Sequence, residues 1–496
     1  MTFRRVLVAN RGEIAVRIIR ACRESGIESV AVFSDADADA PHVYAADRSV
    51  RIGPASPAES YLSISAVIGA ARSAGADAVH PGYGFLSENP AFARACEAAG
   101  CTFIGPPGDV IERMGSKIAA RELMVSAGVP VVPGVTPGDQ SDTGIAAAVV
   151  QVGYPALVKA SAGGGGKGMR VLRDEQAGRE LIPAARREAV TAFGDGTLYV
   201  ERLVDQPRHV EIQVFCDNHG DAVHLFEREC SIQRRHQKVI EESPSPGLTP
   251  KLRQAMGAAA VAAAQVAGYR NAGTIEFLLE GTGDAASFYF LEMNTRLQVE
   301  HPVTEAVTGV DLVQAQLVVA AGGALPWSQE HLTQRGHAIE LRVYAEDPAT
   351  GFLPQAGPLL VYREPQGPGI RIDSGVREGG VIPVDYDPLL AKLTVTAESR
   401  PAAINRAIAA LRAFVVLGIR TNIPFLGHVL DHPDFRAGRL HTGFIDQHLA
   451  RLLATPDPPD EALAAAATGR PSVRAPSVAG SPAAGDPWAT LRRWGR

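Results

Sequence analysis

Two carboxylates and one amide stand where a divalent cation could bind them. Glu276 lies in the middle of the strand-like run 274–278, and Glu292 and Asn294 lie two residues apart in the strand-like run 288–294. Side chains alternate at period two along a strand, so Glu292 and Asn294 share one face, and a hairpin can bring Glu276 to them. Carboxylates in apolar strands are costly unless something neutralises them, and oxygen ligands suit Mg²⁺. We predict a Mg²⁺ site here, with a structural salt bridge as the alternative.

A glycine-rich loop lies between two further strand-like runs. The loop SAGGGGKG, residues 161–168, follows the run 156–159 and precedes MRVL, residues 169–172. Its glycines satisfy G-x-G-x-x-G, but the next run looks like a strand, whereas a dinucleotide fold or a P-loop needs a helix there. A flexible loop between strands can instead fold over phosphates and present backbone N–H groups to them. We predict phosphate binding by this loop, with a long hairpin turn as the alternative.

Two other segments place charged side chains near these motifs. The basic run in ECSIQRRHQK, residues 229–238, continues into a strand-like segment, which would put His236 and Lys238 on one face as an anion site. A solvated face is the alternative reading of this run. Beyond the metal-binding strand, Arg296 and Glu300 are four residues apart, a spacing that suggests an anion clamp and a general base. A plain Arg–Glu ion pair is the alternative there.

The elements that must position these residues divide the chain into α/β and α+β parts. Strand-like and helical runs alternate over residues 5–110, with strands at 6–9, 29–33 and 76–80 and helices at 13–20 and 63–74. This order predicts a parallel sheet covered by helices. New units begin near residues 114 and 335, and the Ala/Pro-rich end of the chain cannot bury enough apolar surface to fold alone. We expect domains at 1–113, 114–334 and 335–447, followed by a disordered tail at 448–496.

Composition excludes several classes of protein. A chain of 496 residues should hold about three domains. Its 48 basic and 54 acidic side chains give a net charge of −6, which argues against a sequence-independent nucleic-acid binder. Its five cysteines form no C-x-x-C pair, so a disulfide framework or a zinc site is not expected. No signal peptide is recognisable, and the longest bland run, 258–266, is too short for a membrane span, so we expect a soluble, cytoplasmic protein.

Five segments stand out: ANRGEIA (9–15), HPGYGFLSEN (80–89), the glycine loop (163–169), RRHQK (234–238) and EMNTRLQVEHP (292–302). Together they resemble biotin carboxylase, the ATP-grasp enzyme of the biotin-dependent acyl-CoA and pyruvate carboxylases. The likeness extends from about residue 4 to residue 447 and implies an N-terminal parallel α/β domain, an ATP-grasp domain and a C-terminal biotin carboxylase domain.

The resemblance also implies a role for each matched residue. Those expected at the nucleotide are Lys117 and Lys159 on the phosphates, Gly165 and Gly166 in a lid, Glu201, Arg202, Leu203 and Val204 around the adenine, and His209, Gln233 and His236 as further contacts. Those expected at Mg²⁺, or Mn²⁺ in its place, are Glu276, Glu292 and Asn294. Those expected at bicarbonate are Lys238, Arg296 and the backbone of Val299, with Glu300 as the base and Arg342 on the ureido group of biotin.

The implied function is the carboxylation of biotin by ATP and bicarbonate through carboxyphosphate. This is the first half-reaction of a biotin-dependent acyl-CoA or pyruvate carboxylase, a step used in fatty acid biosynthesis. Expected partners are a carrier protein that bears the biotin, a carboxyltransferase and a second copy of the chain. No lysine follows Lys392, and none of the six methionines flanks a lysine, so we expect biotin to be attached to a separate polypeptide.

Two other functions stay open at this stage. One is a different ATP-grasp ligase, which would form a carboxylated or carbamoyl intermediate on a small molecule. The other is a catalytically inactive scaffold, against which the complete set of Lys238, Glu276, Glu292, Arg296 and Glu300 argues. The final acceptor of the carboxyl group is not specified by any residue of the chain.

Overall fold

The computed structural model describes residues 3–162, 168–454 and 460–468. Residues 1–453 belong to one compact unit and residues 454–496 to a second. In the second unit the described element is α16 (Asp460–Thr468). The last helix of the first unit, α15 (Phe444–Leu452), extends beyond residue 447, where the predicted tail begins.

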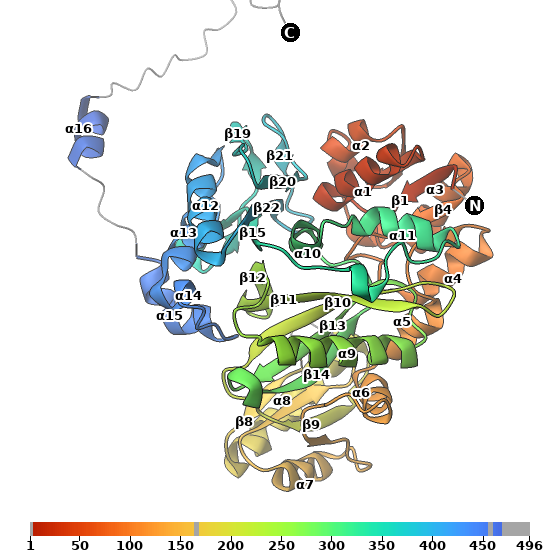
Figure 1. Ribbon diagram of the computed structural model, residues 1–496, viewed down its shortest axis with the longest axis vertical. Helices are drawn as coiled ribbons and strands as arrows, with labels where there is room; N and C mark the ends of the chain where they lie inside the picture. The colour runs from red at the N-terminus through yellow and green to blue at the C-terminus, as the bar shows by residue number, and fades with distance from the viewer. Residues whose placement is uncertain (1–2, 163–167, 455–459, 469–496) are drawn as a thin grey trace, which may run out of the picture. The chain divides into compact units, whose positions relative to one another are not determined.

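The first part of the chain forms a parallel five-stranded sheet with helices around it (Figure 1). The order is β3-β2-β1-β4-β5, and every neighbouring pair is parallel. Val6, Leu7 and Val8 in the central strand are fully buried, as expected of a strand covered on both faces. This confirms the predicted parallel α/β architecture. The strands are β1 (Arg5–Val8), β2 (Glu28–Ser34), β3 (Arg48–Gly53), β4 (Ala78–His80) and β5 (Thr102–Phe103), and the helices are α1 (Gly12–Glu24), α2 (Pro41–Ala45), α3 (Ile64–Ala74), α4 (Pro90–Ala98) and α5 (Gly108–Gly115).

A small four-stranded sheet holds the strands on either side of the glycine loop. Its order is β6-β9-β7-β8, and β7 pairs antiparallel with both β9 and β8. The two strands expected at 156–159 and 169–172 are therefore present, whereas loop residues 163–167 lie outside the described part of the chain. The elements here are α6 (Lys117–Ser126), β6 (Gly134–Val135), α7 (Asp142–Val152), β7 (Ala156–Ala160), β8 (Arg170–Leu172), α8 (Glu175–Phe193) and β9 (Leu198–Arg202).

One antiparallel eight-stranded sheet joins the middle of the chain to its C-terminal part. Its order is β14-β13-β10-β11-β12-β15-β22-β20, and β12 pairs with β15 although about a hundred residues separate them in sequence. Helix α9 packs across β10 and β11, and α10 contacts β11, β12 and β15. The strands are β10 (Arg208–Cys216), β11 (Ala222–Arg234), β12 (Gln237–Ser243), β13 (Asn271–Glu280), β14 (Ser287–Asn294), β15 (His337–Tyr344), β20 (Ile370–Ser374) and β22 (Leu389–Ala397), and the helices are α9 (Pro250–Val266), α10 (His301–Thr308) and α11 (Leu312–Ala320).

The C-terminal part adds helices and short strand pairs to this sheet. Residues of β15 and β22, among them Leu341 and Leu393, share one core with Ile404 and Leu426 from α12 and α13. The remaining elements are β16 (Glu346–Asp347), β17 (Leu353–Pro354), β18 (Gly357–Pro358), β19 (Val361–Arg363), β21 (Val381–Ile382), α12 (Arg400–Ala413), β23 (Val415–Leu417), α13 (Ile423–Asp431) and α14 (Pro433–Arg436).

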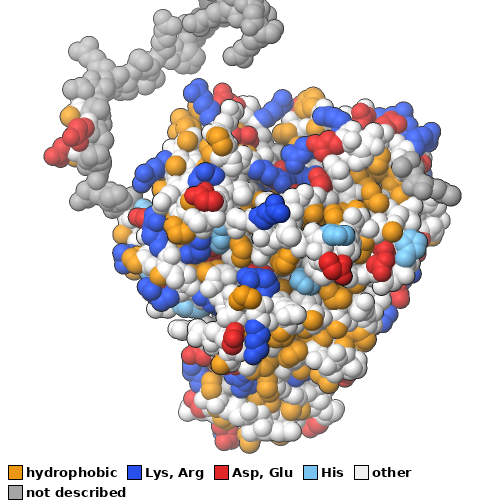
Figure 2. Space-filling model, in the orientation of Figure 1, with side chains coloured by type: hydrophobic (Ala, Val, Ile, Leu, Met, Phe, Trp, Pro, Cys, Tyr) orange, Lys and Arg blue, Asp and Glu red, His pale blue; other side chains and the backbone are white. Residues whose placement is uncertain are grey.

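The surface has a mixed charge, in keeping with the small net charge. Acidic and basic side chains are interspersed over the face that Figure 2 shows. Among the described helices none is both long and apolar enough to cross a membrane alone, although α10 and α11 together, bent by 98°, pass the same test of length and composition. Most side chains of these two helices are buried, which is typical of helices in a protein core.

Candidate active site

A cavity of about 500 Å³, here called cavity A, lies between the small sheet and the β13–β14 hairpin. Its volume is within the range of small-molecule sites. It brings together all the described residues expected at the nucleotide and two of the three expected at the metal; Gly165 and Gly166 fall outside the described part of the chain. The predicted residues that line it are Lys117, Lys159, Glu201, Arg202, Leu203, Val204, His209, Gln233, His236, Glu276 and Glu292.

Strands β7 and β9 fix the basic end of cavity A. Lys159 Nζ lies 3.0 Å from Glu201 Oε2, and Arg121 Nη1 donates to Glu201 Oε1 at 2.9 Å. Burial alone would lower the pKa of Lys159, but Tyr199 and Glu201 outweigh it, so the pKa is raised. Burial lowers the pKa of Lys117, although Glu292 opposes the shift. Both lysines are positioned to meet an anion, and Lys159 is held in place by a carboxylate.

The segment 229–238 is a hairpin rather than one continuous strand. Arg235 and His236 have positive φ angles of 49° and 66°, and they form the turn between Arg234 and Gln237, which are paired across β11 and β12. The expectation that His236 and Lys238 lie on one strand face is therefore wrong. His236 stands in the turn at the rim of cavity A, and Lys238 points from β12 into the polar core.

Glu276 and Glu292 lie directly opposite each other, because they are Cα partners in the β13–β14 pair. Asn294 Nδ2 donates to Glu276 Oε1 at 2.8 Å, so the hairpin brings all three predicted ligands together. Burial and the charge of Glu276 raise the pKa of Glu292. Like charges directly opposite each other on neighbouring strands are destabilising, and a divalent cation between the two carboxylates would remove this repulsion. The donor set therefore fits Mg²⁺.

Lys238 is the centre of a buried ion-pair cluster. Its Nζ lies 2.5 Å from Glu211 Oε2, 2.7 Å from Glu276 Oε1 and 2.6 Å from Glu300 Oε1. Burial alone would lower the pKa of Lys238, but the three carboxylates outweigh it and hold the pKa well above its ordinary value. Lys238 is therefore fully charged and is the shared counter-ion of three acids.

Arg342 extends this cluster from β15. Its Nη2 donates to Glu300 Oε2 at 2.9 Å, and its Nε donates to Glu241 Oε1 at 2.6 Å. Burial alone would raise the pKa of Glu300, but the charges of Lys238 and Arg342 outweigh it, and the pKa lies below its ordinary value. Glu300 is thus a carboxylate whose two oxygens face two different cations.

Arg296 is paired with the N-terminal part of the chain and not with Glu300. Its Nε donates to Glu88 Oε2 at 2.9 Å, and Glu88 Oε1 accepts from the backbone N–H of Thr295 at 3.0 Å. The plain Arg296–Glu300 ion pair that the sequence left open is therefore not formed among the described side chains. Glu88 belongs to the HPGYGFLSEN segment, which the sequence had already marked as similar to biotin carboxylase. That similarity did not indicate that Glu88 pairs with Arg296.

Several buried charged residues of the cluster were missed by the sequence analysis. Arg228, fully buried on β11, donates to Glu211 Oε1 at 2.5 Å and to four neutral oxygens. Behind Arg342, Glu241 and Glu340 are Cα partners across β12 and β15. Burial raises the pKa of Glu241 to about 7 and that of Glu340 to about 8. The available signal was the one used for Glu276, a charged residue within an apolar strand.

A second cavity, cavity B, has a volume of about 420 Å³ and lies on the other side of the cluster. Its lining includes Arg296, Val299 and Arg342, the residues expected at bicarbonate and biotin, together with Tyr83 and Asp387. Lys392 Nζ donates to the Val299 carbonyl at 2.7 Å and so fixes the backbone at this wall. A continuous series of ion pairs, Glu276–Lys238–Glu300–Arg342, connects cavity A to cavity B.

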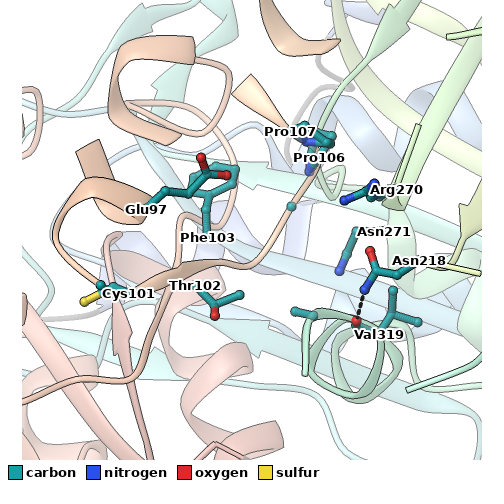
Figure 3. A pocket seen from close by; sticks show the side chains of 13 residues that line it. Glu97, Cys101, Thr102, Phe103, Pro106, Pro107, Asn218, Arg270, Asn271 and Val319 are labelled. Atoms are coloured by element: carbon teal, nitrogen blue, oxygen red, sulfur yellow. Dashed lines mark hydrogen bonds between the residues drawn. The ribbon is translucent and has the colours of Figure 1, made fainter. Parts of the chain in front are cut away.

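Another cavity of about 440 Å³ lies between β5, the start of β13 and the end of α11 (Figure 3). Asn218 Nδ2 donates to the Val319 carbonyl at 2.9 Å along its wall. Arg270 and Glu97 supply its charged side chains. Its lining includes no residue of the predicted site, so within the described chain the predicted chemistry gathers at cavities A and B.

Comparison with known proteins identifies three family models in order along the chain. The N-terminal domain of biotin carboxylase matches residues 2–111, the ATP-binding domain of the carbamoyl-phosphate synthase L chain matches residues 116–328, and the C-terminal domain of biotin carboxylase matches residues 340–447. Biotin carboxylase from Halalkalibacterium halodurans is 51% identical over 447 residues, which are 90% of this chain and 98% of that protein.

Solved structures and longer relatives are also similar to this chain. The biotin carboxylase–β,γ-ATP complex from Campylobacter jejuni has a TM-score of 0.87 and 44% identity, covering 90% of this chain and 99% of that one. The biotin carboxylase domain dimer of Hydrogenobacter thermophilus 2-oxoglutarate carboxylase, with MgADP, ADP and bicarbonate, has a TM-score of 0.88 and 44% identity, covering 92% of this chain and 100% of that one. The α-subunit of rat mitochondrial methylcrotonoyl-CoA carboxylase is 50% identical over 91% of this chain, which spans only 63% of that subunit.

The fold and the two connected cavities define an ATP-grasp enzyme with three domains of the biotin carboxylase type. The chain belongs to the biotin carboxylase family, the ATP-dependent ligases that carboxylate biotin with bicarbonate. The resemblance drawn from the sequence, with its expected three-domain architecture, is thereby confirmed.

Proposed function

We propose that this chain carboxylates biotin with ATP and bicarbonate. We also propose that Glu300 lies between the site of ATP cleavage and the site of biotin carboxylation. The observation that supports this most directly is the series of ion pairs from Glu276 in cavity A to Arg342 in cavity B. The nucleotide would occupy cavity A and biotin cavity B. Bicarbonate would lie between them, beside Lys238 and Arg296.

In cavity A the basic side chains would orient the transferring phosphoryl group. Lys159 enters from the small sheet, Lys117 from the start of α6, and His209 and Gln233 from the large sheet. Phosphoryl transfer depends mainly on such positioning and on the offsetting of negative charge. The backbone of residues 201–204 would line the base, since the Arg202 side chain is turned away to Glu280 at 2.8 Å.

Mg²⁺, when bound by Glu276, Glu292 and the Asn294 amide oxygen, would supply positive charge to the phosphates. Replacing Glu292 with Gln should therefore raise the Mg²⁺ concentration that half-saturates bicarbonate-dependent ATP cleavage, because a neutral amide attracts a hard cation less strongly. Glu280→Gln is the matched control, since Glu280 lies on β13 but pairs with Arg202. ADP release measured over a wide range of Mg²⁺ concentrations tests this prediction. An unchanged half-saturating Mg²⁺ concentration in the Glu292 variant would mean that Glu276 and Glu292 have a structural role instead.

Beside the nucleotide, Glu300 would accept the proton of bicarbonate while Lys238 and Arg296 hold the anion in line with the γ-phosphorus of ATP. The bicarbonate oxygen attacks that phosphorus, the bond to ADP breaks, and carboxyphosphate forms. Carboxyphosphate then divides into CO₂ and phosphate, phosphate takes the proton from biotin N1′, and N1′ bonds to CO₂. Arg342 would stabilise the negative charge on the ureido oxygen.

The proposed activity has a direct test with the purified chain. ADP release should require bicarbonate and should increase when free biotin is added, and labelled bicarbonate should appear in carboxybiotin. A different ATP-grasp ligase would release ADP without any response to biotin, and an inactive scaffold would release none. Either result would contradict the proposed function.

We further propose that biotin arrives attached to a protein carrier and that a carboxyltransferase takes the carboxyl group onward. The Hydrogenobacter thermophilus domain is a dimer, which supports pairing of two copies here. All five cysteines are unpaired and buried, as in proteins of reducing compartments, and this supports a cytoplasmic location.

A further inference from the structure

Four large apolar side chains are exposed in or next to the short strand pairs of the C-terminal part. They are Leu360, Val381, Val384 and Leu417, and their exposed fractions are 66%, 68%, 84% and 54%. We call this set the apolar strip. Leu360 N–H donates to the Leu417 carbonyl at 2.8 Å, and Val381 pairs with Pro358 across β18 and β21. Leu417 and Val381 therefore lie in strands, Leu360 lies between β18 and β19, and Val384 follows β21 by two residues.

The strip is not needed to fill the core beneath it. Leu359 and Ile382, the chain neighbours of Leu360 and Val381, are buried at 0% and 6% exposure. Because side chains alternate between faces, the outward positions of these strands would ordinarily be polar. Several large apolar side chains side by side on the outside of a protein usually mark an interaction surface.

The position of the strip relative to cavity B indicates what binds there. Val381 and Pro383 line a further cavity of about 260 Å³, here called cavity C. Cavities B and C share Arg11, Gly12, Asp387 and Leu389 in their walls. Val381 of the strip therefore lines a cavity that shares wall residues with cavity B, which contains Arg296 and Arg342.

We propose that the apolar strip is the docking surface for the protein domain that carries biotin. This inference rests on the proposed function, because biotin enters cavity B while it is still attached to its carrier. The carrier must then sit beside cavity B, where the strip offers it an apolar surface that reaches cavity C through Val381. A surface with only four large side chains supports weak, transient contact, which suits a carrier that must leave after each carboxylation.

The experiment compares carrier-bound biotin with free biotin in surface variants. Leu360→Glu and Val384→Glu replace members of the strip that lie outside the strands. Val150→Glu on α7 is the matched control, since Val150 is 63% exposed and belongs to neither the strip nor cavities A, B and C. The probes are a purified biotinylated carrier domain and free biotin, each assayed by bicarbonate-dependent ADP release.

Both strip variants should lower kcat/KM for the carrier domain by at least about tenfold, mainly through KM, as expected when a contact at the centre of an interface is lost. Their kcat/KM for free biotin should stay within about twofold of wild type, and the control should match wild type with both probes. Equal losses with the two probes, or no loss with the carrier, would overturn the docking surface.

Two further outcomes separate the alternatives. A change in sedimentation coefficient together with an unchanged carrier KM would assign the strip to contact between two copies of the chain and would also overturn the inference. Failure of the proposed function has a different signature, because the wild-type chain itself would then show no response to free biotin.

Discussion

Replacing Glu300 with Gln should lower the rate of biotin carboxylation by about 10²–10⁴-fold, the usual cost of losing a general base. The amide keeps one oxygen, which can accept from only one of Lys238 and Arg342, the donors that lie 2.6 and 2.9 Å from the two carboxylate oxygens, and it cannot take the bicarbonate proton. Glu300 does not line cavity A, so the KM for ATP should change little. Steady-state ADP release and carboxybiotin formation measure the two quantities.

Glu305→Gln is the matched control for this substitution. Glu305 is also a buried carboxylate held by two cations, Arg17 at 2.9 Å and Arg371 at 2.7 Å, but it lies outside cavities A and B. Its loss should reduce thermal stability while kcat stays near the wild-type value. If Glu300→Gln were to turn over at nearly the wild-type rate, or if both variants lost activity equally, Glu300 would not be the base.

The β13–β14 hairpin could be predicted from sequence because its signal is local. Strands 274–278 and 288–294 are short, apolar and close in the chain, so alternation at period two places Glu276, Glu292 and Asn294 on one face. The observed register pairs Glu276 with Glu292, as this reasoning requires. The same holds for the parallel sheet, whose strands and helices alternate clearly between residues 5 and 80.

The turn at Arg235 and His236 could not be predicted in this way. Two-residue hairpin turns with positive φ normally contain Asn or Gly, and here Arg and His adopt φ angles of 49° and 66° instead. Without such a residue the basic run looks like continuous strand. The surrounding sheet and the ion pairs of its strands select a conformation that these two residues alone would disfavour.

Contacts between distant parts of the chain could not be predicted from the sequence either. Glu88 binds Arg296 across 208 positions, and β12 meets β15 with Glu241 opposite Glu340. No local pattern states which strands of a sheet become neighbours. The roles expected for these residues therefore rest on the resemblance of whole segments to biotin carboxylase. The Glu88–Arg296 contact and the β12–β15 pairing are visible only in the structure.

Replacing Lys238 with Met should have the largest combined effect on stability and activity. Met keeps roughly the length of the side chain but removes the positive charge that Glu211, Glu276 and Glu300 share at distances of 2.5, 2.7 and 2.6 Å. Removing one partner of a buried ion pair costs about 3–5 kcal/mol of unfolding free energy. Losing a preorganised charge at the reacting group costs about 10²–10³-fold in kcat.

Three measurements separate these effects. Calorimetry should show a lower Tm for Lys238→Met, whereas Lys251→Met, at an exposed position on α9, should leave both Tm and kcat unchanged. Adding Glu276→Gln to Lys238→Met should cost less stability than the sum of the two single changes, because the second substitution removes one of the uncompensated charges. Equal Tm values for Lys238→Met and wild type would show that the other cations, Arg228, Arg342 and His209, already neutralise the three carboxylates, and Lys238 would then act in catalysis alone.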